Sequence, residues 1–244
     1  MMSNIPDQTD SNCPLAAVSI IILIIMAALT GTLFAVTKYP AMLPGLASSL
    51  LGADPKAFWY ISRATALVAF FLLWLSMAMG VTITNRLAKV WPGGPTAFEL
   101  HEFFSLLGIA FALFHGMILM GDHYIHYSLT QVLVPFSSQQ YKPLWVGLGQ
   151  LAFYAWGIIV LSFYFRKRIS TRVWRLIHYA TYLIFLLALA HGVVSGTDSG
   201  FSWTNTLYWA SGVSLFFLLV YRILVSAGNK QKRHVMAPAS ESSG

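Results

Sequence analysis

The sequence predicts an all-α membrane protein built as a polytopic bundle of six transmembrane helices. Hydrophobic residues make up 57% of the 244 residues and charged residues only 9%, whereas a soluble domain has about 25% charged residues. Six apolar stretches are each long enough to cross a hydrocarbon core of about 30 Å. These stretches are Leu15–Val36, Phe58–Ile83, Phe98–Met120, Trp145–Phe165, Val173–Val194 and Thr204–Val225.

The segments outside these stretches are short or polar. The leader before the first stretch contains Asp7 and Asp10 but no lysine or arginine, so we expect a retained helix and not a secretory signal. Prolines and glycines mark segments 38–56 and 91–95 as irregular connections. We therefore expect a flexible N-terminal segment over 1–14, one membrane domain over 15–227, and a disordered cytoplasmic tail over 228–244.

The distribution of lysine and arginine predicts the orientation in the membrane. Basic residues concentrate in the second and fourth connections and in the tail, whereas the opposite connections balance three lysines against three aspartates. Because basic short loops stay in the cytoplasm, we expect a bacterial inner-membrane or plasma-membrane type of protein with both termini inside. The net charge of +7 follows from this asymmetry, so no nucleic acid is expected as a partner.

Four histidines lie within two of the apolar stretches. The third stretch contains His101 and His115, fourteen positions apart, and the fifth contains His178 and His191, thirteen positions apart. An ionisable residue at membrane depth is costly and marks a functional site by default. Helical rises of about 21 Å and about 19.5 Å separate the members of each pair, so each stretch would offer one inner and one outer histidine.

Imidazoles at equal depth on two helices can ligate one iron from opposite sides. The pattern predicts an inner haem held by His101 and His178, and an outer haem held by His115 and His191. The single cysteine, Cys13, excludes thioether attachment, so the haem would be of the b type. We expect two haems, with one as a possibility. Iron with two histidine ligands has no open position, which favours electron transport.

The spacing in the fifth stretch leaves one geometric question. At about 100° per residue, a fourteen-position spacing falls about 40° short of four turns, so His101 and His115 share a helix face. A thirteen-position spacing falls about 140° short, and His178 and His191 diverge on an ideal helix. Either this helix is locally distorted or the two haems approach it from different directions.

These residues resemble the ferric-reductase-like transmembrane domain superfamily, which includes NADPH oxidases, ferric reductases, STEAP metalloreductases and the bacterial haem subunit MsrQ. The similarity covers about residues 50–225. It rests on the two histidine pairs, on Leu51–Pro55 and Arg63–Leu67 before and within the second stretch, and on the run from Trp174 to His191. The resemblance implies a six-helix bundle with haem b between the third and fifth helices.

The chain departs from individual members of that group. MsrQ has no histidine at the position matching His101, so the two-haem members are more similar there. Leu119 stands where NADPH oxidases have a further histidine, which disfavours superoxide production. We expect no flavin or nicotinamide domain of their kind in this protein. We therefore expect a separate cytoplasmic flavin reductase or a quinol as electron donor, and an external metal ion or protein as acceptor.

Arginines and further histidines are secondary candidates. Arg63 matches an arginine near the outer haem of relatives, and would pair with a haem propionate unless it reaches to the headgroups. Arg172 and Arg175 would serve inner propionates, although the positive-inside rule also explains them. His123 and His126 form either an external metal-docking point or part of an interfacial segment. Gly116 and Gly192, each next to an outer histidine, would let a flat macrocycle approach.

Two other functions use the same residues. A quinol-linked cytochrome b anchor would keep the haem ligands and add a quinone pocket. A non-redox membrane protein would use the four histidines for packing or proton movement. The sequence favours a dihaem b-type cytochrome, an oxidoreductase component that carries electrons from a cytoplasmic donor across the bilayer.

Overall fold

The computed structural model describes residues 44–52, 56–122 and 124–236, together with positions 20, 24, 27, 28, 31, 38, 39 and 41. Contacts divide the chain into two units, residues 1–60 and 61–244. The first unit contains the short helix α2 (Pro44–Leu51). The first expected span, Leu15–Val36, and the expected flexible segment 1–14 lie almost entirely outside the described residues.

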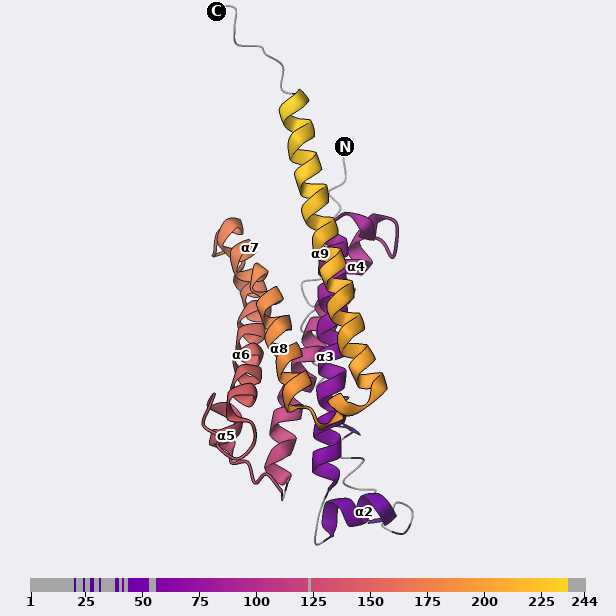
Figure 1. The fold of residues 1–244 in the computed structure, drawn as a ribbon, viewed down its shortest axis with the longest axis vertical. Coiled ribbons are helices and arrows are strands. Elements are labelled where there is room, and N and C mark those ends of the chain that lie inside the picture. Colours follow the sequence, from indigo (N-terminus) through magenta and orange to yellow (C-terminus); the bar gives the residue numbers. More distant parts are fainter. Residues whose placement is uncertain are drawn as a thin grey trace, which may run out of the picture. The chain divides into compact units, whose positions relative to one another are not determined.

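All regular structure in the described part of the chain is helical (Figure 1). Five helical segments there are long and apolar enough to cross a membrane, so the expectation of an all-α integral membrane protein is confirmed at that level. They comprise α3 (Ala57–Thr84), α4 (Gly94–Ile118) with the 3-10 turn η2 (Leu119–Gly121), α6 (Pro143–Phe165), α7 (Thr171–Tyr179) with α8 (Thr181–Ser195), and α9 (Ser202–Met236).

Local sequence explains where the helices begin. Proline occupies the first turn of both α4 and α6, where its missing N–H needs no partner and its fixed φ suits a helix. The hydroxyl of Ser170 accepts a hydrogen bond from the Val173 N–H and caps α7. Ser128 and Gln131 form a capping box for the short helix α5 (Leu129–Leu133).

The fifth expected span is interrupted directly after its first histidine. Ala180 separates α7 from α8, and its N–H bonds to the Ile177 carbonyl, which is a tighter turn than an α-helix makes. The hydroxyl of Thr181 donates to the His178 carbonyl at 2.8 Å and satisfies a carbonyl at the break. The helix that carries His178 and His191 is therefore locally distorted, which was one of the two explanations offered for their spacing.

The C-terminal segment corrects one sequence expectation. Residues 228–236 continue α9 to Met236, although a disordered tail was expected over 228–244. Lysine, glutamine and arginine are good helix formers, and no proline occurs before Pro238, so the membrane helix continues into polar sequence. Residues 237–244 lie outside the described part.

The buried core lies between α3, α6, α8 and α9. Phe70 of α3 stacks on Phe185 of α8, with ring centroids 5.5 Å apart, and meets Tyr208 of α9 edge-on at 5.1 Å. Trp156 of α6 is buried in the same cluster. This aromatic layer lies partway along α3 and α8, and it holds the helices that position the histidines.

Candidate functional site

The structure brings the four histidines together as two facing pairs. The ring centroids of His101 and His178 are 6.0 Å apart, with planes inclined at 74°. Those of His115 and His191 are 6.2 Å apart, with planes inclined at 68°. Each pair joins one ring from α4 to one from the α7–α8 segment, and the pairing is the one expected from equal depth.

Backbone carbonyls hold three of the four rings. The Nδ1 atom of His101 lies 2.7 Å from the Ser76 carbonyl oxygen, and that of His115 lies 2.9 Å from the Ser62 carbonyl oxygen. The Nδ1 atom of His191 lies 2.9 Å from the Trp145 carbonyl oxygen. A carbonyl can only accept a hydrogen bond, so in each neutral ring Nδ1 carries the proton.

This tautomer leaves Nε2 as the nitrogen with a free lone pair. A metal-ligating histidine almost always donates its other N–H in this way, which fixes both the tautomer and the ring orientation. A metal held between two imidazoles by bonds of about 2.0 Å would keep the ring centroids roughly 6 to 6.5 Å apart. The separations of both pairs fall within that range.

The fourth ligand candidate, His178, is held by an aromatic contact. Its ring stacks on the Trp174 indole one turn earlier in α7, with centroids 5.1 Å apart and planes inclined at 19°. Stacking of this kind orients a ring without using either nitrogen.

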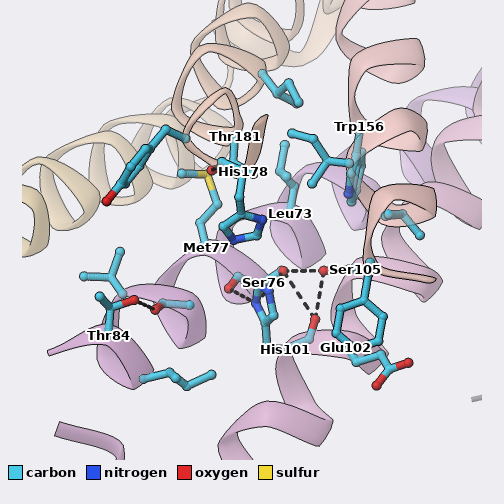
Figure 2. A pocket seen from close by; sticks show the side chains of 18 of the residues that line it. Leu73, Ser76, Met77, Thr84, His101, Glu102, Ser105, Trp156, His178 and Thr181 are labelled. Atoms are coloured by element: carbon cyan, nitrogen blue, oxygen red, sulfur yellow. Dashed lines mark hydrogen bonds between the residues drawn. The ribbon is translucent and has the colours of Figure 1, made fainter. Parts of the chain in front are cut away.

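A cavity of about 350 Å³ surrounds the inner pair. Figure 2 shows His101 and His178 projecting into it from different helices, with Ser76 and Ser105 beside His101. Its walls come from α3, α4, α6, α7, α8 and α9, and they are mostly apolar. The volume falls within the range of about 300–1,000 Å³ usual for cofactor pockets.

Two serines that the sequence analysis missed complete the α4 sites. The Ser76 hydroxyl lies 3.1 Å from His101 Nδ1, and the Ser62 hydroxyl lies 2.9 Å from His115 Nδ1. Both serines are buried on α3. Their separation along the chain equals that of His101 and His115, and this matched spacing was a signal present in the sequence.

Two of the histidine rings pack closely against glycines, where a larger residue would crowd them. A Cβ at Gly149 would lie 2.6 Å from Nδ1 of His191, and one at Gly80 would lie 3.2 Å from Cε1 of His101. The two glycines singled out from the sequence, Gly116 and Gly192, lie against protein side chains. A Cβ at Gly192 would meet the Tyr208 hydroxyl at 2.9 Å, and one at Gly116 would meet Val132 at 3.3 Å.

Arg63, expected beside the outer haem, has a protein partner that was not foreseen. Its Nε donates to Asp198 Oδ2 at 2.7 Å, and its NH2 group pairs with the other carboxylate oxygen. Asp198 lies in the turn η3 (Thr197–Gly200), which follows the helix of His191. The bidentate ion pair thus joins the N-terminal part of α3 to the segment after α8.

A further arginine at the inner cavity was also missed. Arg222 of α9 is half-buried, lines the cavity, and donates to the Tyr179 hydroxyl at 3.1 Å. Its guanidinium also lies over the Tyr179 ring, 5.4 Å from its centroid. Arg172 and Arg175 are both exposed on α7, and of the two only Arg175 lines the same cavity.

The docking role expected for His123 and His126 stays a prediction. In the described part of the chain, no group of three or more histidine, cysteine, aspartate or glutamate side chains is close enough to hold a metal ion. His123 lies outside the described residues. Asp122 is buried and accepts from the N–H groups of Tyr124 and Ile125, so its carboxylate organises a turn.

Comparisons of the chain with protein families, with curated proteins and with solved structures find no match.

Proposed function

We propose that this protein is a membrane dihaem b-type cytochrome, a relative of the ferric-reductase-like transmembrane proteins, that transports electrons across the bilayer. The observation that supports this proposal best is the tautomer and the separation of the paired histidine rings. Three half-buried imidazoles donate Nδ1–H to carbonyls, and each pair has the separation that one metal ion requires. Packing alone has no need for facing rings with a free Nε2.

The residues of the inner site fit a haem group. When bound there, haem would supply a one-electron couple at an iron with no open coordination position. His101 and His178 would ligate the iron, and the apolar walls would exclude water. Donors suited to propionate carboxylates are also present: Arg175 and Arg222 line the cavity, and the Trp174 indole N–H is buried without a partner among the described residues.

In the outer site, His115 and His191 would be the iron ligands. Arg63 belongs to the same helix as Ser62, which holds His115. Arg63 would donate to a propionate of the outer haem in addition to Asp198, through a charge-assisted hydrogen bond. The inner site would face the cytoplasm, and both termini would lie inside, as the positive-inside rule predicts.

Electrons would enter at the inner site and leave at the outer one. The donor would be a separate cytoplasmic flavin reductase, and the acceptor an external metal ion or partner protein. Because an electron that moves outward leaves the negative side of the membrane, a potential of 100 mV would assist its transfer by about 2.3 kcal/mol.

The test is a dithionite-reduced-minus-oxidised spectrum of the purified protein. We expect b-type bands that decrease by about half in His101→Ala and in His115→Ala. His126→Asn is the matched control, because it removes a histidine outside the pairs and asparagine tolerates the positive φ of 54° found there. Wild-type protein without haem bands would refute the proposal.

A quinol-linked cytochrome b is the second candidate, and one observation favours it. Trp174 Nε1 and Glu102 Oε1 are both buried without a hydrogen-bond partner in the described part of the chain, and both residues line the inner cavity. A quinone headgroup offers acceptors for the indole, and a carboxylate can take a quinol proton. Haem reduction by a soluble quinol, lost in Glu102→Gln, would favour this candidate over a flavin reductase.

A further inference from the structure

Two serines on α3 hold the two histidines of α4 in a repeated antiparallel register. Ser62 and Ser76 are as many residues apart on α3 as His101 and His115 are on α4. Ser62 contacts His115 and Ser76 contacts His101, so the two helices run in opposite directions. Each serine offers its carbonyl and its hydroxyl to the histidine Nδ1. The same contact is therefore built twice, once at each depth.

The proton of each serine hydroxyl can be placed from its partners. Ser62 donates to the His115 carbonyl at 3.1 Å. At the inner depth, Ser105 donates to the His101 carbonyl at 2.8 Å, and Ser76 lies 2.6 Å from the Ser105 hydroxyl. Because Ser105 has one proton and gives it to the carbonyl, we infer that Ser76 donates to Ser105, which is nearer than its other acceptor, the His101 carbonyl at 3.4 Å.

The inner site thus has a hydroxyl chain that the outer site lacks. Ser105 lies one turn after His101, and the residue at the equivalent place after His115 is Leu119, which has no hydroxyl. A hydroxyl that donates onward becomes a better acceptor, since hydrogen bonds in a chain strengthen one another. Ser76 therefore accepts the His101 Nδ1–H more strongly than an isolated hydroxyl would.

We propose that Ser62 and Ser76 are positioning residues, each tuning the iron at one depth, and that Ser105 tunes the inner iron alone. The inference rests on the proposed haem function. An acceptor on Nδ1–H increases the basicity of the ligating imidazole, and a more basic ligand favours the oxidised iron. The chain through Ser76 and Ser105 therefore lowers the reduction potential of the inner haem.

The test is a potentiometric titration of the purified haem-loaded protein, followed by the visible bands. We expect Ser105→Ala and Ser76→Ala to raise the same one of the two potentials, with Ser76→Ala giving the larger shift. Ser62→Ala should raise only the other potential. Ser162→Ala is the control, because this buried hydroxyl bonds within its own helix, to the Ile159 carbonyl at 2.6 Å, and it should shift neither.

Two further measurements keep the test decisive. Ser76→Thr retains a hydroxyl and should keep the wild-type inner potential. This variant tests the role of the hydroxyl even if Ser76→Ala fails to retain haem. Low-spin electron paramagnetic resonance signals, which report ligand-ring orientation, should change for the inner haem in Ser76→Ala and for the outer haem in Ser62→Ala.

The possible outcomes distinguish a failure of the serine roles from a failure of the proposed dihaem function. Wild-type protein without haem would refute the dihaem proposal. Two haems with the expected histidine dependence, but with potentials that stay fixed or shift together in the serine variants, would overturn only the role of the serines.

Discussion

The indole of Trp174 lies against the imidazole of His178, nearly parallel to it and 5.1 Å away. The two residues are one helical turn apart on α7, and the helix breaks at Ala180, just beyond His178. Stacking therefore supports this ring where backbone carbonyls support the other three. We expect Trp174→Leu to lower inner haem affinity by about 10-fold to 100-fold, the cost usual for lost ligand support.

Haem retention during dilution in detergent would measure that effect. Trp174→Phe keeps an aromatic ring and should retain most of the affinity. Equal losses for leucine and phenylalanine would show that stacking is not what holds His178.

Gly149 and Gly80 provide a paired test of ring position. Alanine at Gly149 would bring a Cβ to 2.6 Å from the His191 ring, whereas alanine at Gly80 would come only to 3.2 Å from His101. Overpacking of this kind costs about 1–3 kcal/mol. We expect Gly149→Ala to lose most of the outer haem and Gly80→Ala to keep most of the inner haem, as judged by haem content per chain. Equal retention in both variants would contradict this geometry.

Arg222 should matter for the inner site alone. Its half-buried guanidinium lines the inner cavity and bonds to Tyr179. A hydrogen bond to a charged group contributes about 1.5–3 kcal/mol, so Arg222→Gln should weaken inner haem binding by about 10-fold or more. Arg222→Lys retains the charge and should lose less. The account would be contradicted if Arg222→Gln reduced only the outer haem.

The Arg63–Asp198 pair predicts a coupling between two distant sequence positions. Both side chains are largely buried, with 25% and 12% of their surface exposed. Removing one partner leaves a partly buried charge without this ion pair, which costs more than removing both. We expect Arg63→Met and Asp198→Asn each to destabilise the protein by about 1–3 kcal/mol, with the double variant less affected than the sum. Thermal unfolding in detergent would measure this, and additive effects would exclude the coupling.

The histidine pairs show how far a sequence can predict such a site. Equal depth follows from helical rise alone, so the partner of each histidine could be expected from the spacing and the span boundaries. The break at Ala180 could not, because it depends on how α7 and α8 pack. The spacing of His178 and His191 indicated only that some distortion was possible.

The supporting residues were harder to predict for a different reason. The carbonyls of Ser62, Ser76 and Trp145 act through the backbone, so residue type does not mark them. Asp198 could be seen only as one aspartate in an outer turn, since its partnership with Arg63 spans 135 residues. The matched spacing of the two serines was readable, but it acquires meaning only once α3 and α4 are known to be antiparallel neighbours.

The central claim is that paired imidazoles hold iron porphyrin at two depths. A pyridine haemochrome assay on the purified full chain, with protein measured by amino-acid analysis, tests it most directly. The account predicts two haems b per chain, falling to one in His115→Ala and to one in His101→Ala. A wild-type value near zero, or a value unchanged in both histidine variants, would contradict it.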